Sequence, residues 1–182
     1  MICHAGNLPA LKVGRQKVVG YETDWIERAL ARAAHAGGLH DCPFLKDLSE
    51  GVLHYLERNC SLQLFPIELL FERMRGMLRK IGCPEIADHL TPLAPPVTVS
   101  MIGPARQAGP GSTKTFFSIL REEISFLHRS GAEIIHFCDV EESIRLLGGK
   151  AERLRSEIRA FLDGRHNRTF APPQELLLTL EP

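Results

Sequence analysis

The stretch Thr91-Pro-Leu-Ala-Pro-Pro, residues 91–96, decides how this chain is organised. Proline fixes its own φ and has no backbone N–H, so three prolines in six residues resist the continuation of a helix. Helical patterns precede the stretch, and an alternating strand pattern follows it. We therefore predict a helical unit over residues 1–92, a proline-rich linker over 93–96, and a small α/β unit over 97–182.

The first unit opens with the pattern of a short β-hairpin. Residues 12–21 combine valines and a tyrosine, which favour strands, with two glycines, which permit turns. Apolar residues then recur at helical spacing in four segments, residues 21–36, 45–59, 66–81 and 84–90. Thr23 or Asp24 is expected to cap the first of these helices, and Gly37-Gly38 to end it.

The second unit alternates strand and helix patterns. Strands are expected at 97–102, 133–138 and 175–180, a Gly/Pro-rich loop at 103–112, and helices between the strands. Asp139-Val-Glu-Glu has the D-x-x-E spacing of a capping box, which predicts a helix start there. The order strand, helix, strand predicts a parallel crossover. Both units together predict an α+β fold, mostly helical.

Composition limits the class of protein. The chain has 182 residues, 44% of them hydrophobic and 24% charged, as in a globular protein. Lys plus Arg and Asp plus Glu both number 22, so nucleic acid is disfavoured as the main partner. No run reaches the ~18 apolar residues that a membrane-spanning helix needs, and the N-terminus lacks the pattern of a secretory signal.

The cysteines indicate a reducing compartment. There are five, and none forms a CxxC pair, which disfavours both a disulfide framework and a zinc ribbon. Cys3 with His4, or His40 with Cys42, supplies only two metal ligands where a structural zinc site needs four. We expect a cytoplasmic protein without a metal site.

The first half resembles the ATP-cone, the nucleotide-sensing module of ribonucleotide reductases and of the repressor of their genes. The likeness covers about residues 9–92. It rests on Lys12, Gly14 and Arg15, and on three segments: Tyr21-Glu-Thr-Asp-Trp-Ile-Glu-Arg-Ala-Leu, the apolar helix 66–78, and Gly82-Cys-Pro-Glu-Ile-Ala-Asp-His-Leu. The resemblance implies a site for ATP or dATP with Mg²⁺, in which Lys12, Arg15 and Lys17 face the phosphates. Clustered cations beside a helix N-terminus make a physically reasonable anion site.

Trp25 departs from the family pattern, because ATP-cones commonly have a lysine at this position. The tryptophan either stacks on the base of the nucleotide or packs in the interior. The hairpin is also one basic residue short of the family's usual run. Two versions of the module therefore stay open, one with a working site and one with a vestigial site.

A second, weaker anion site is predicted at Ser112, Thr113 and Lys114. The stretch Gly109-Pro-Gly-Ser-Thr-Lys-Thr follows a predicted strand and precedes a predicted helix, as a phosphate-binding loop would. Ala108 and Thr113, however, occupy positions where such a loop needs glycine. The backbone N–H groups of Ser112 and Thr113, together with Lys114, remain as a simpler site at a helix start.

These observations favour a non-catalytic regulatory or interaction module, with no catalytic residue assigned. Its partner would be another protein or a second copy of the chain. One alternative is a small ligand-binding protein or enzyme with a pocket between the two halves, near Arg106, Lys114 and His136. The other alternative is a protein-interaction scaffold that binds no ligand.

Overall fold

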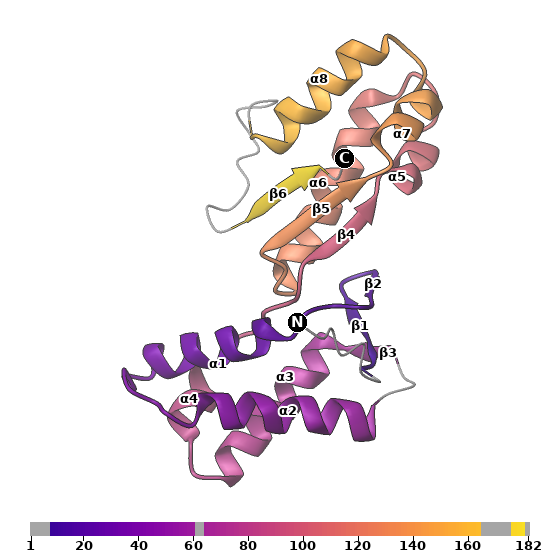
Figure 1. The fold of residues 1–182 in the computed structure, drawn as a ribbon. Helices are drawn as coiled ribbons and strands as arrows, with labels where there is room; N and C mark the ends of the chain where they lie inside the picture. The colour runs from indigo at the N-terminus through magenta and orange to yellow at the C-terminus, as the bar shows by residue number, and fades with distance from the viewer. Residues whose placement is uncertain (1–7, 61–63, 165–175, 181–182) are drawn as a thin grey trace. The chain divides into compact units, whose positions relative to one another are not determined.

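The computed structural model describes residues 8–60, 64–164 and 176–180 (Figure 1). Within those ranges it has eight helices and two three-stranded sheets, which is an α+β fold, mostly helical. The chain divides into two compact units, residues 1–95 and 96–182. The boundary falls inside the proline-rich stretch, but Leu93 and Ala94, predicted as linker, are buried.

The first unit begins with a hairpin and continues with helices separated by one further strand. Its elements are β1 (Ala10–Val13), β2 (Gln16–Val18), α1 (Asp24–Ala36), α2 (Leu45–Asn59), β3 (Leu64–Pro66), α3 (Ile67–Lys80) and α4 (Pro84–His89). α1 packs against α2 and α4, and α4 also packs against α3. Figure 1 shows the small sheet at one end of these helices.

The sheet of this unit has the order β2-β1-β3, with β2 antiparallel and β3 parallel to β1. Leu11 pairs with Val18 on one side and with Phe65 on the other, and all three side chains are buried. Successive side chains of a strand point to opposite faces. Lys12 therefore lies on the opposite, exposed face of the sheet.

Two helices of the first unit approach each other closely at a glycine. A Cβ added to Gly37, just after α1, would lie 2.9 Å from the backbone oxygen of Glu85 in α4. Gly37 itself has φ −79, whereas Gly38 has φ +81 and supplies the left-handed residue at the helix end. Gly37 is thus required by packing and Gly38 by backbone conformation.

The second unit is a parallel three-stranded sheet with helical connections. Its elements are β4 (Val97–Ser100), α5 (Ile102–Ala108), α6 (Thr113–Arg129), β5 (Ile134–Cys138), α7 (Val140–Leu147), α8 (Ala151–Leu162) and β6 (Leu177–Leu180). The strand order is β4-β5-β6, and both pairings are parallel, as the predicted crossover requires. In Figure 1, α6 runs behind this sheet.

The two faces of the second sheet differ in polarity. Val97, Val99, Ile135 and Phe137 alternate along β4 and β5 and are all buried. The opposite face carries Thr98, His136 and Thr179, which are neighbours in register across the three strands and are not buried. One Nδ1···Oγ1 hydrogen bond joins His136 to Thr179.

Two local predictions were wrong. Helix α5 starts at Ile102, the last residue of the expected strand 97–102, and takes up the first part of the expected loop 103–112. Pro104 is tolerated in a first helical turn, and the next four residues are compatible with a helix. The capping box at Asp139 does not form, since this side chain makes no cap hydrogen bond and its backbone is left-handed, with φ +61. Thr23 occupies the N-cap of α1, also without a side-chain cap hydrogen bond.

Candidate functional site

The hairpin β1–β2 is the element on which the predicted cations lie. Val13 pairs with Gln16, so Gly14 and Arg15 form a two-residue turn. Gly14 has φ +58 and Arg15 does not have a positive φ, which is the pattern of a type II′ turn. This tight turn fixes the register of the two strands.

The register brings two lysines together. Lys12 of β1 pairs directly with Lys17 of β2, and both side chains are exposed on the same face of the sheet. Directly opposite residues of antiparallel strands have Cβ atoms roughly 4.5–5.5 Å apart. Within the described part of the chain, neither ammonium group has an ion pair or hydrogen bond. Two uncompensated positive charges therefore face solvent side by side.

Arg15 adds a third cation at the turn, and its side chain is exposed. The hairpin is anchored at its base by Tyr21, whose hydroxyl donates a 2.9 Å hydrogen bond to the backbone oxygen of Pro9. Burial raises the pKa of the Tyr21 phenol far above its ordinary value, and the nearby Cys60 adds to the rise. The phenol therefore stays protonated and keeps its role as a donor.

Trp25 lies in the interior of the first unit. Its side chain is 0% exposed, and its ring meets Tyr21 edge-on at 6.3 Å and Phe71 at 6.2 Å between centroids. A ring without exposed surface offers no face to a nucleotide base, so this position favours the packing alternative. Among the described residues, its buried indole N–H has no hydrogen-bond partner.

The second predicted anion site lies at the start of α6. The N–H of Ser112 donates to the backbone oxygen of Gly109 at 3.3 Å, which occupies one of the two backbone donors proposed for that site. Thr113 is the first residue of α6, and Lys114 follows it with an exposed side chain. A helix start with one exposed lysine remains, without a further feature that marks a ligand.

The sequence favoured a pocket near the strand ends around residues 103–114, and not at the carboxyl ends of β5 and β6. A cavity of about 610 Å³ opens there, lined by Asp139, Glu141, Arg155 and neighbouring residues. Arg106, Lys114 and His136, expected around a pocket, do not line this cavity. Asp139 could have indicated this pocket, because it directly follows β5. Ligands of open α/β sheets bind beyond the carboxyl ends of the strands.

Two of the charged residues that line this cavity, Glu141 and Arg155, form an ion pair. Arg155 of α8 donates two 2.8 Å hydrogen bonds to the carboxylate of Glu141 in α7, and a third to Glu152. These bonds hold the pKa of Glu141 below its ordinary value and raise that of Arg155. Hydrogen bonds from Ser100 and Cys138 likewise lower the pKa of Asp139. The ion pair between Glu141 and Arg155 links α7 to α8.

Among residues 8–60, 64–164 and 176–180, no three His, Cys, Asp or Glu side chains gather as a metal site would require. In the same ranges, no helix is long and apolar enough to cross a bilayer. No protein-family model matches the chain, and neither a curated protein nor a solved structure is similar to it.

Proposed function

We propose that the first unit is a non-catalytic, nucleotide-responsive module that binds ATP or dATP through its hairpin. The observation that carries the proposal is the direct pairing of Lys12 with Lys17 on an exposed face. Like charges directly opposite each other destabilise a strand pair. A phosphate group bound between them removes that repulsion and replaces it with charge-assisted hydrogen bonds.

Arg15 extends the same surface, because it occupies the turn that joins the two strands. Three cations on one hairpin suit a triphosphate, which presents several oxygens along its length, with or without Mg²⁺. The order hairpin, α1, α2, α3, α4 also agrees with the resemblance to the ATP-cone, which supports the same assignment. Trp25 takes no part in this site and serves as packing beneath it.

Binding would act as a switch by favouring one association state of the protein over another. A ligand shifts such an equilibrium only if its affinity for the two states differs. The partner is then a second copy of the chain or another protein. Light scattering with and without ATP distinguishes a change in self-association from its absence.

The test is thermal unfolding followed by tryptophan fluorescence, since Trp25 is the chain's single tryptophan and reports on the first unit. A ligand at about a hundred times its dissociation constant stabilises the folded state by about 2.7 kcal/mol. ATP or dATP is expected to raise the midpoint in a concentration-dependent way. Lys12→Gln, Arg15→Gln and Lys17→Gln should each reduce the shift.

Lys46→Gln is the matched control, because Lys46 is an exposed lysine of α2 in the same unit but outside the hairpin. A shift that survives the double change Lys12→Gln with Lys17→Gln would contradict the assignment of the site. No shift at millimolar nucleotide would mean that the module is vestigial. The ligand-free scaffold would then become the better description of the first unit.

A further inference from the structure

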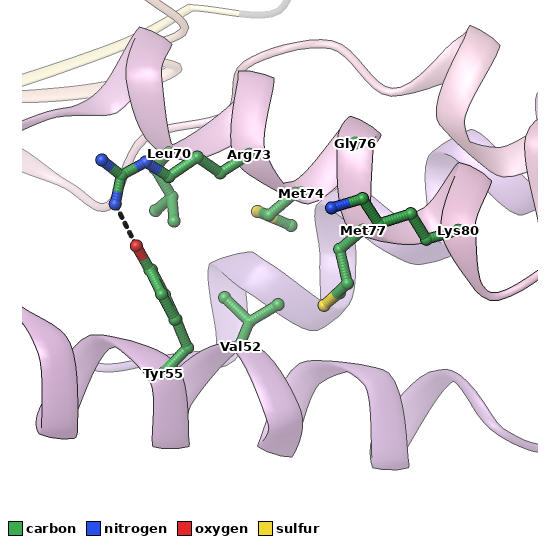
Figure 2. A pocket seen from close by; sticks show the side chains of 8 residues that line it. All are labelled: Val52, Tyr55, Leu70, Arg73, Met74, Gly76, Met77 and Lys80. Carbon is green, nitrogen blue, oxygen red and sulfur yellow. Dashed lines mark hydrogen bonds between the residues drawn. The ribbon is translucent and has the colours of Figure 1, made fainter.

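A cavity of about 440 Å³ lies between α2 and α3, and the described residues that line it all belong to these two helices (Figure 2). Its accessible apolar surface comes from the half-buried Tyr55 and Met77. Val52, Leu70 and Met74, which are at most 2% exposed, form the floor beneath them. Small-molecule pockets range from about 300 to 1,000 Å³ and are mostly apolar. The two methionines can also adapt their shape to a ligand. The cavity thus has the size and lining of a small-ligand pocket.

Gly76 leaves the middle of this pocket open. It is an interior residue of α3, where glycine destabilises a helix relative to alanine. A Cβ added to Gly76 would meet no atom within 4 Å, so packing in the described structure does not require glycine here. The missing side chain instead exposes the helix surface to the cavity that it lines.

Two cations stand at opposite ends of the pocket. Arg73 and Lys80 are seven residues apart on α3, which places their backbones about 10 Å apart along the helix. Arg73 donates a hydrogen bond to the hydroxyl of Tyr55 and lies 5.1 Å from the ring centroid of Phe65. Lys80 makes no ion pair or hydrogen bond within the described residues. Figure 2 shows its side chain running back along α3 toward Gly76.

None of the described residues that line the cavity beside these cations is acidic. Arg73 is held by neutral partners, and its orientation closes the end of the pocket near Tyr55. Lys80 is therefore the cation that is available to bind a ligand. The pocket therefore offers apolar surface along its length and one available positive charge, on a side chain that runs from Lys80 back toward Gly76.

We propose that this pocket binds an amphiphilic anion, with its apolar body on Tyr55 and Met77 and its anionic head at Lys80. The site is independent of the nucleotide site proposed above. Its walls do not suit a triphosphate, which needs several cations or a metal along its length. A hydrocarbon chain or ring system that ends in a single carboxylate matches both the walls and the charge.

The experiment is titration calorimetry of the full chain with decanoate, decanol and acetate. Decanoate is expected to bind, decanol to bind at least about tenfold more weakly, and acetate not to bind, because both parts of the ligand are needed. Lys80→Gln should weaken decanoate by at least about tenfold while leaving decanol unchanged. Equal affinities for decanoate and decanol would overturn the role of Lys80.

Gly76→Leu tests the place of binding by filling the cavity, and it should abolish binding of both decanoate and decanol. Gly51→Leu is its matched control, because Gly51 is an interior glycine of α2 whose added Cβ also meets nothing within 4 Å. Gly51 does not line the cavity, so this variant should bind decanoate normally. Unchanged binding in Gly76→Leu would overturn the proposal.

Two further outcomes identify other occupants. If ATP displaces decanoate and Gly76→Leu weakens both, the nucleotide occupies this pocket, which overturns both site assignments. If Gly76→Leu instead abolishes a concentration-dependent dimer on which decanoate has no effect, a second copy covers the groove. Loss of decanoate binding in Lys12→Gln with Lys17→Gln is not expected, which keeps the two proposals separable.

Discussion

The hairpin of the first unit and the α7–α8 surface of the second use charge in opposite ways. On the hairpin, Lys12 faces Lys17 and no carboxylate compensates either of them within the described chain. On α7–α8, Arg155 lies between Glu141 and Glu152 and binds both. The two lysines gain a partner only when an anion binds, whereas Glu141 and Arg155 already have one within the fold. The proposed recognition by the hairpin rests on this difference in pairing.

The largest effect is expected from truncating one buried phenylalanine in each unit. Phe71, 0% exposed, packs on Trp25 in the first unit, and Phe161 packs on Phe117 at 5.0 Å in the second. Phe71→Ala and Phe161→Ala should each lower the free energy of unfolding of their own unit by about 3–5 kcal/mol. Urea unfolding followed by both tryptophan fluorescence and far-UV circular dichroism separates the units.

In that measurement, Phe71→Ala should shift the fluorescence transition, and Phe161→Ala should shift only the dichroism. If Phe161→Ala shifts the fluorescence transition equally, the two units unfold together. The two surfaces could not then be compared as properties of separate units.

A smaller effect on the free energy of unfolding is expected from glycine substitutions in the first unit, which leave all its charged residues unchanged. Gly37→Ala forces a Cβ to within 2.9 Å of the Glu85 backbone oxygen and should destabilise the unit by about 1–3 kcal/mol. Gly51→Ala meets open space and should stabilise it by about 0.5–1 kcal/mol. Thermal unfolding by tryptophan fluorescence measures both changes.

Both glycine variants should keep the full nucleotide-dependent shift of the midpoint, because the hairpin cations are unchanged. If the Gly37→Ala variant is folded before heating but nucleotide no longer raises its unfolding midpoint, then helix packing, and not hairpin charge, governs binding.

The smallest effects are expected from the charges themselves, and they have opposite signs. Lys12→Gln removes a like-charge repulsion and should stabilise the first unit by at most about 1 kcal/mol. Glu141→Gln removes the main partner of Arg155 and should destabilise the second unit. Because the pKa of Glu141 is lowered from 4.5, its contribution is present above pH 4.5 and is lost as pH falls through the folded-state value.

The difference in melting temperature between the unmodified chain and Glu141→Gln should therefore shrink as pH falls below 4.5, as measured by circular dichroism. Glu122→Gln, at an exposed position of α6, serves as the control and should show no such pH-dependent difference. A Lys12→Gln variant that is less stable than the unmodified chain would contradict the repulsion between the paired lysines.

The sequence predicted the long helices well, because apolar residues at helical spacing report directly on a buried helix face. It missed β3, a three-residue strand that exists only by pairing with β1, since such a pairing leaves no local pattern. It also missed the left-handed backbone of Asp139, because the capping-box spacing fits a helix start whether or not the cap forms.

For the candidate site, the sequence proposes residues but does not give their geometry. Lys12, Arg15 and Lys17 were selected through a family resemblance, but their arrangement depends on the two-residue turn at Gly14 and Arg15, which sets the register. The pocket between α2 and α3 needs both helices in place. Its marker in the sequence is Gly76 inside a helical pattern, and a glycine there is equally compatible with a helix end or a close packing contact.

The parallel pairing of β1 with β3 also orders events during synthesis. A two-stranded hairpin alone is at best marginally stable in water, so β1 and β2 need β3 and the helices beneath them to persist. Leu64 is made roughly fifty positions after Ala10, its partner in the sheet. At translation rates of about 5–20 residues per second, several seconds pass before the third strand can join. The cationic face is thus encoded among the first residues of the unit but becomes durable only when most of that unit has been translated.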